Sequence, residues 1–123
     1  MNPVKHMAII MDGNGRWGLK YKNSRNLGHK EGLKTVEMVM RYCMEKQIKF
    51  LTLYAFSTEN WKRPLKERNY LFNLLEDYLK EKLEEINNEK VRIKILGEKN
   101  FSKKLNNLLN LAEKKTIKNT KLQ

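Results

Sequence analysis

A short glycine-containing segment near the N-terminus has the residue types that bind anions. It reads Asp12-Gly13-Asn14-Gly15-Arg16. Two glycines around an asparagine allow positive φ angles and a close approach of the backbone, so successive amide groups can converge on a phosphate. Arg16 adds a planar cation, and Asp12 is placed to hold a divalent cation such as Mg²⁺ that phosphate oxygens would share. An ordinary tight turn is the alternative interpretation of this segment.

An arginine and a histidine follow at a helical spacing. Arg25 and His29 are four residues apart, which is about one turn if this stretch is helical, and Gly28 and Gly32 lie beside them. Next to an anion-binding turn, such a pair on one helix face favours further phosphate contacts. The alternative is a histidine that makes a purely structural hydrogen bond.

A polar segment in the middle of the chain is the second candidate for ligand contacts. It follows an apolar run and leads into a helical pattern, the position at which parallel sheets bind ligands. Its side chains supply hydroxyl groups, a carboxylate, an amide, an indole and cations: Ser57, Thr58, Glu59, Asn60, Trp61, Lys62 and Arg63. Helix capping by Ser57 and Thr58 and a core position for Trp61 are the alternatives, and both are compatible with ligand binding.

Three apolar runs predict the strands that position these segments. Residues 7–11 and 50–56 have the composition of buried parallel strands. Residues 91–96 alternate apolar and basic side chains, so this third strand is expected nearer a sheet edge. The first strand should lead into a loop over residues 12–28, and Gly97 should end the third strand.

Helical spacing of apolar residues fills the intervals between the strands. Repeats at three and four residues predict helices over 33–48, 65–86 and from Phe101 to Ala112. Pro64 suits the first turn of the second helix, and Ser102 is a plausible N-cap of the last one. The order of elements predicts an α/β fold, a parallel sheet with right-handed crossovers and helices on its faces.

Length and composition limit the class of protein. The 123 residues form one domain at most, and with 40% hydrophobic residues they can bury a core. No apolar run approaches the roughly 20 residues of a membrane span, and the N-terminus has no signal-peptide pattern, so we expect a cytoplasmic protein. The single cysteine, Cys43, excludes an internal disulfide and a cysteine-based zinc site, and its apolar helix face predicts burial.

The chain is strongly basic. It carries 26 Lys and Arg against 14 Asp and Glu, a formal net charge of +12. Such a field favours anionic ligands: nucleic acid, acidic lipid headgroups or diphosphates. The codon bias of an AT-rich genome is the alternative explanation of this Lys- and Asn-rich composition.

Three ordered motifs together resemble the cis-prenyltransferase family, to which undecaprenyl diphosphate synthase belongs. Residues 6–17, His-Met-Ala-Ile-Ile-Met-Asp-Gly-Asn-Gly-Arg-Trp, are similar to the family signature. Residues 25–32 resemble the second block and residues 51–64 the third, and residues 91–97 continue the similarity. The resemblance spans essentially the whole chain and therefore implies a truncated form of the family's α/β fold.

The resemblance implies sequential condensation of isopentenyl diphosphate onto an allylic diphosphate such as farnesyl diphosphate, with cis double bonds and Mg²⁺ as the cofactor. Asp12 would be the catalytic, metal-linked carboxylate. Asn60 would be the proton acceptor, although a neutral amide is a poor base and a relay to diphosphate or water is physically easier. Substrate contacts are implied for Gly13, Asn14, Gly15, Arg16, Trp17, Arg25, His29, Ser57, Thr58, Glu59, Trp61 and Arg63.

The resemblance also implies partners and a product. Helices 33–48 and 65–86 would line the tunnel for a growing prenyl chain, which becomes a lipid carrier of cell-wall synthesis. Full-length members form homodimers, and peripheral membrane contact through the lipid product is expected. With Asp only at positions 12 and 77, the Asp-rich metal motif of trans-type prenyl synthases is excluded, and so is a Walker phosphate loop.

Members of this family are considerably longer than 123 residues. We therefore expect the N-terminal half of a catalytic domain, in a single domain over 1–123, without the later Arg-rich block for isopentenyl diphosphate and without the C-terminal Glu of the metal site. Alone, such a chain is expected to be weakly active or inactive.

Two other classes of protein are alternatives. A small basic nucleic-acid-binding domain would use the +12 charge and the aromatic residues Trp17 and Trp61, but the basic residues are dispersed and no RNA-recognition or zinc-finger pattern is present. A non-catalytic partner subunit would be expected to lose the Asp12 segment, which is intact here. We therefore expect diphosphate substrates and no nucleic acid.

Overall fold

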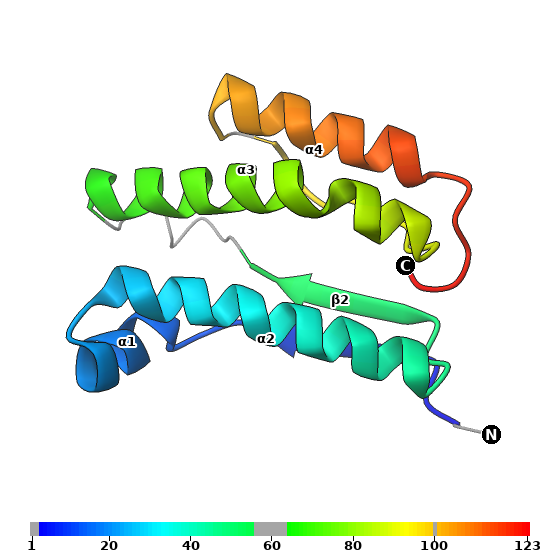
Figure 1. Ribbon diagram of the computed structural model, residues 1–123, viewed down its shortest axis with the longest axis horizontal. Helices are drawn as coiled ribbons and strands as arrows, with labels where there is room; N and C mark the ends of the chain where they lie inside the picture. The colour runs from blue at the N-terminus through cyan, green and yellow to red at the C-terminus, as the bar shows by residue number, and fades with distance from the viewer. Residues whose placement is uncertain (1–2, 56–63, 100) are drawn as a thin grey trace. The chain divides into compact units, whose positions relative to one another are not determined.

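The computed structural model describes residues 3–55, 64–99 and 101–123 (Figure 1). The chain is grouped into two compact units, an N-terminal unit of Met1–Leu71 and a C-terminal unit of Phe72–Gln123. The elements in order are β1 (His6–Ile10), α1 (Asn14–Lys22), α2 (Arg25–Glu45), β2 (Phe50–Tyr54), α3 (Leu65–Asn88) and α4 (Lys103–Thr116). The predicted α/β class with a parallel sheet is confirmed, whereas the single domain stays a prediction.

Strands β1 and β2 form the parallel sheet of the N-terminal unit. His6 lies opposite Phe50 and Ile10 lies opposite Tyr54, and the amide of Met11 continues the pairing by donating to the carbonyl of Tyr54 over 3.2 Å. The predicted runs 7–11 and 50–56 thus contain the two strands, which end at Ile10 and Tyr54, and Phe56 lies outside the described residues. Their expected burial is wrong, since Ile10 is 76% exposed, and the reason is that the described sheet has only these two strands.

Helix α1 lies where the sequence predicted a loop over residues 12–28, and that prediction is wrong. Its glycines disfavour a helix by about 1 kcal/mol each relative to alanine, and its nine residues show no apolar repeat. The helix forms between two residues with left-handed backbone, Gly13 (φ 83°) and Asn23 (φ 53°). Packing against α2 therefore outweighs its weak intrinsic propensity.

Helix α2 begins eight residues before the first apolar repeat that predicted it. The Ser24 side chain caps it by accepting a hydrogen bond of 3.2 Å from the amide of Leu27. Arg25 and His29 therefore lie in its first two turns, beside α1 (Figure 1). Cys43, near the other end of α2, is buried as predicted, and burial raises the pKa of its thiol.

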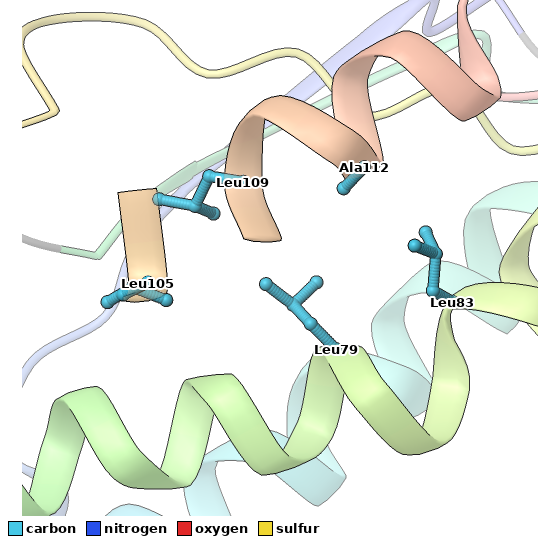
Figure 2. Packing of buried hydrophobic residues seen from close by; sticks show 5 residues of the cluster. All are labelled: Leu79, Leu83, Leu105, Leu109 and Ala112. Carbon is cyan, nitrogen blue, oxygen red and sulfur yellow. The ribbon is translucent and has the colours of Figure 1, made fainter. Parts of the chain in front are cut away.

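The C-terminal unit is built around leucines of α3 and α4, which run side by side in the same direction (Figure 1). Figure 2 shows the side chains of the two helices directed toward each other: Leu79, Leu83, Leu105, Leu109 and Ala112. Both predicted helices are confirmed, with α4 ending later than its apolar repeat. The predicted N-cap is confirmed too, because Ser102 Oγ accepts from the amide of Leu105 at 3.1 Å.

The third predicted strand, residues 91–96, does not form a ladder in the described part of the chain. Val91 makes a single parallel bridge with Leu122. The amide of Ile93 instead donates to Thr116 Oγ1 at 2.9 Å, and the amide of Ile95 donates to Glu113 Oε2 at 3.0 Å. Side chains of α4 thus take the hydrogen bonds that a neighbouring strand would have taken, which is why this prediction was wrong.

None of the helices in the described ranges is both long enough and apolar enough to cross a membrane.

Candidate functional site

The N-terminal end of α1 presents backbone amides at the carboxyl end of β1. The amide of Gly13 donates to Asp12 Oδ1 at 2.7 Å, and the first helical bond runs from the amide of Trp17 to the carbonyl of Gly13 at 2.9 Å. No side chain of the described residues caps this end of the helix. The amides of Asn14, Gly15 and Arg16 therefore lack helical acceptors, and this positive helix end suits an anion.

Arg25 lies against the first turn of α1. A Cβ atom on Gly15 would lie 2.7 Å from Arg25 Nη2 and 2.8 Å from Arg25 Cζ, distances that would force the guanidinium away. Glycine at position 15 thus lets a cation from α2 approach the amide-bearing end of α1. The sequence predicted Gly15 as part of an amide nest, and the structure gives it this additional steric role.

Glycines also set the contact between α1 and α2. A Cβ atom on Gly18 would lie 2.3 Å from the carbonyl oxygen of Ser24, and one on Gly28 would lie 1.9 Å from the carbonyl oxygen of Asn14. The Asn14 side chain lies over Gly32, where a Cβ atom would be 2.5 Å from Nδ2. The two helix backbones therefore touch directly, which holds Arg25 and His29 beside the start of α1.

Arg25 and His29 converge on one oxygen atom of Glu67, in the first turn of α3. Glu67 Oε1 lies 3.3 Å from Arg25 Nε, 3.2 Å from Arg25 Nη2 and 2.8 Å from His29 Nε2. The His29 and Glu67 side chains are 7% and 10% exposed, while that of Arg25 is 39% exposed. The site is thus a nearly buried anion position with a partly open arginine at its edge.

Glu67 was missed by the sequence analysis. Its signal was a carboxylate in the first turn of a helix, which the helix dipole alone explains. Nothing in the spacing relates it to His29, because 38 residues separate the two. Only the folded N-terminal unit brings them together.

Asp12 and Arg16 flank the same helix end but are exposed. Arg16 Nη2 lies 3.4 Å from Asp12 Oδ1, and both side chains are more than 70% exposed, so this ion pair adds little stability. Among the described residues no three His, Cys, Asp or Glu side chains gather as metal ligands. One carboxylate still suits Mg²⁺, which commonly takes one or two carboxylates together with substrate phosphates and waters.

The remaining predicted contacts divide into two groups. Trp17 lies on α1, packs against Tyr21 with ring centroids 5.6 Å apart, and is 41% exposed. The predicted residues of the second segment lie outside the described part of the chain: Ser57, Thr58, Glu59, Asn60, Trp61 and Arg63.

Comparison with known proteins identifies the family of this chain. Residues 10–123 match the family model described as "Putative undecaprenyl diphosphate synthase". The chain belongs to this family.

Relatives within the undecaprenyl diphosphate synthase family cover almost the whole chain. The chain is 46% identical over 120 residues to a ditrans,polycis-undecaprenyl-diphosphate synthase, (2E,6E)-farnesyl-diphosphate specific, of Buchnera aphidicola; the match covers 97% of this chain and 48% of the relative. It is 45% identical to an isoprenyl transferase of Helicobacter hepaticus, over 96% of this chain and 50% of the relative. The chain thus spans about half the length of the curated relatives it matches.

Two solved structures are similar to this chain in fold. A probable undecaprenyl diphosphate synthase of Campylobacter jejuni matches with a TM-score of 0.76 and 37% identity, over 99% of this chain and 52% of that one. Lavandulyl diphosphate synthase of Lavandula x intermedia, in complex with dimethylallyl diphosphate, matches with a TM-score of 0.88 and 25% identity, over 94% of this chain and 50% of that one.

Proposed function

We propose that this chain binds an allylic diphosphate and takes part in its condensation with isopentenyl diphosphate to a cis-polyprenyl diphosphate. The observation that carries the proposal is the convergence of Arg25 and His29 on a single carboxylate oxygen beside the uncapped end of α1. Further support comes from a relative named as specific for farnesyl diphosphate and from a structural neighbour in complex with dimethylallyl diphosphate.

The geometry around Glu67 Oε1 suits a phosphate oxygen. Three nitrogen atoms surround this position at 2.8 to 3.3 Å, so a phosphate oxygen in the same place would accept charge-assisted hydrogen bonds from the same groups. The amides of Asn14, Gly15 and Arg16 and the guanidinium of Arg16 would bind further oxygens of the diphosphate.

Asp12 is the proposed catalytic, metal-linked carboxylate. Bound Mg²⁺ would neutralise negative charge on the departing diphosphate. Asn60 and the other predicted residues of the 57–63 segment belong to the same proposal as contacts to the reacting end of the substrate. Trp17 is proposed as a substrate contact through the family motif that it completes.

The proposed cellular setting follows from the family. We propose that the whole enzyme is a cytoplasmic homodimer, that its product is a lipid carrier of cell-wall synthesis, and that the product brings it to the membrane surface. The apolar faces of α2 and α3 are proposed to line the path of the prenyl chain. The +12 net charge supports attraction of the anionic substrates.

Isothermal titration of farnesyl diphosphate, with and without Mg²⁺, tests the binding proposal. We expect micromolar binding, and Arg25→Ala should weaken it about 10- to 100-fold, since a hydrogen bond to a charged group contributes about 1.5–3 kcal/mol. Lys118→Ala is the matched control, because it removes an exposed cation from the C-terminal unit. Equal weakening by both variants, or no binding by a folded chain, would overturn the proposal.

Incorporation of radiolabelled isopentenyl diphosphate tests the condensation. Turnover that Asp12→Ala abolishes would show that this chain carries out the reaction by itself. Binding of farnesyl diphosphate without turnover would restrict its function to the allylic site. RNA binding that falls steeply with salt, together with no response to farnesyl diphosphate, would instead favour a nucleic-acid-binding domain.

A further inference from the structure

The outer face of α1 carries Lys20 and Tyr21, which have no role in the proposal above, beside Trp17, a proposed substrate contact. Trp17 and Tyr21 pack one helical turn apart with their rings tilted by 44°, and Lys20 Nζ lies 5.2 Å from the centroid of the Tyr21 ring. Tyr21 is 61% exposed. We refer to Trp17, Lys20 and Tyr21 as the α1 patch.

The segment that carries the α1 patch is basic. Residues 13–30 contain no Asp or Glu and five cations: Arg16, Lys20, Lys22, Arg25 and Lys30. Asp12 pairs with Arg16, Glu67 pairs with Arg25, and Glu31 pairs with Lys34 outside the segment. The net charge of the segment stays positive through Lys20, Lys22 and Lys30. The α1 patch therefore complements an anionic surface.

The arrangement of the rings favours a lipid surface over nucleic acid. Stacking of bases requires an open aromatic face, whereas Lys20 lies over Tyr21 and Trp17 packs against the same side chain. Tyrosine and tryptophan beside lysine are typical of the interfacial region of a bilayer, where an apolar ring and a polar tip are both accommodated.

We propose that the α1 patch docks this chain onto an anionic lipid surface. The nine-residue α1 is too short to span a bilayer, so it would lie at the interface. If the proposed function holds, one consequence follows: the amide-bearing end of the same helix binds the diphosphate, so docking would hold the site at the surface into which a prenyl lipid is released.

Cosedimentation with phosphatidylglycerol-containing vesicles tests the docking. We expect the chain to bind them and not to bind pure phosphatidylcholine vesicles. Lys20→Glu should lower the partition coefficient about 30-fold, because it removes one cation and adds one anion near the surface. Tyr21→Ser should lower it several-fold. Lys118→Glu, which gives the same net charge of +10 from an exposed site in the C-terminal unit, should have little effect.

Tryptophan fluorescence locates the contact. The chain has two tryptophans, so Trp61→Phe leaves Trp17 as the single reporter. On anionic vesicles its emission should shift to shorter wavelength and be quenched by lipids brominated on the acyl chains. Vesicle binding without either change would overturn the assignment to α1.

Four further outcomes would contradict the proposal. These are no binding to anionic vesicles, an equal loss with Lys20→Glu and Lys118→Glu, Tyr21-dependent binding of single-stranded RNA in place of vesicles, and a Tyr21-dependent dimer in sedimentation. Titration of farnesyl diphosphate into the Tyr21→Ser variant separates the two proposals. Retained affinity with lost vesicle binding supports docking, whereas lost affinity would show that Tyr21 serves the fold or the substrate site instead.

Discussion

The two units of this chain hold their helices together in opposite ways. In the N-terminal unit, α1 and α2 meet backbone to backbone at Gly18 and Gly28. In the C-terminal unit, α3 and α4 meet through leucine side chains such as Leu79 and Leu105 (Figure 2). A glycine contact buries little apolar surface but brings backbone amides and charged side chains close together, so the unit that carries the candidate site is the one with the less hydrophobic helix contact.

The two units also differ in what their buried polar side chains bind. In the C-terminal unit they support the backbone hydrogen bonding. Thr116 Oγ1 donates to the carbonyl of Ala112 at 2.7 Å, and Glu76 Oε1 accepts at 3.0 Å from the hydroxyl of Ser102, the side chain that caps α4. In the N-terminal unit, His29 and Glu67 satisfy each other together with Arg25. In the proposed function, a diphosphate oxygen would take the place of Glu67 in the network of the N-terminal unit, whereas the polar groups of the C-terminal unit hold its backbone.

The largest expected effect is loss of the leucine core. Leu105→Ala removes a fully buried side chain and should destabilise the C-terminal unit by about 4 kcal/mol. Hydrogen exchange measured by mass spectrometry should show faster exchange over residues 72–123. Leu111→Ala on the same helix is the control, since Leu111 is 50% exposed. An equal increase in the exchange rate over residues 3–55 would mean that the two units unfold together, which would contradict the contrast drawn between them.

Filling the glycine contact between α1 and α2 with a methyl group should destabilise the N-terminal unit. Gly28→Ala places a methyl group 1.9 Å from the carbonyl oxygen of Asn14, so the helices must separate, at a cost of about 3 kcal/mol. Hydrogen exchange over residues 13–45 should become faster and so report this loss of stability. Gly97→Ala is the matched control: its methyl group meets no atom within 4 Å, and only its positive φ of 91° costs energy, about 1 kcal/mol. Similar effects of the two variants would show that backbone strain, and not helix contact, explains the loss at Gly28.

Neutralising Glu67 should have a smaller effect on stability. Glu67→Gln keeps the shape of the side chain but removes its charge from Arg25 and His29, so the N-terminal unit should lose about 1–2 kcal/mol. Hydrogen exchange over residues 25–45, monitored during thermal unfolding, measures this loss of stability. Added pyrophosphate should reduce the difference between variant and wild type, because it can supply the missing anionic oxygen. An unchanged difference would argue against a shared position for the carboxylate and a phosphate.

The smallest expected effect is a pH dependence of the C-terminal unit. Burial raises the pKa of Glu113, but hydrogen bonds from Lys99 and the Ile95 amide outweigh this and hold the pKa below its usual value of 4.5. A pKa depressed in the folded state contributes stability above the unfolded pKa, and this contribution is lost as the pH falls through the folded pKa. Urea unfolding between pH 6 and about pH 3 should show a loss of less than about 1 kcal/mol that Glu113→Gln removes. A pH profile that this variant leaves unchanged would contradict the assignment.

Regular apolar spacing made most elements predictable. The strands of the N-terminal unit lie in continuous apolar runs, and helices α2, α3 and α4 repeat apolar residues at three and four positions. The sequence therefore located them to within a few residues, apart from the N-terminal turns of α2. Helix α1 lacks such a period. Its glycines signal flexibility in a sequence, although in the fold they allow the close contact with α2 that stabilises the helix.

Among the residues expected to bind ligand, some could be predicted from the sequence and others could not. The four-residue spacing of Arg25 and His29 predicts a shared helix face if the stretch is helical, because helix geometry is local. The structure shows that it is, with α2 beginning at Arg25. Glu67 could not be predicted in this way, because its relation to them depends on how the start of α3 lies in the N-terminal unit. The amides of residues 93 and 95 likewise follow an extended pattern, but their acceptors on Thr116 and Glu113 are set by packing.

The amino-acid sequence by itself determined the family, the α/β class and the anion-binding residue types near the N-terminus. Each of these depends on local composition, short-range spacing or ordered motifs. The tertiary structure decided that Gly15 admits Arg25, that Glu67 holds Arg25 and His29 together, and that residues 91–96 bond to helix side chains in place of a strand ladder. These features join residues far apart in the chain, and their free energies arise from contacts that form only when the helices pack.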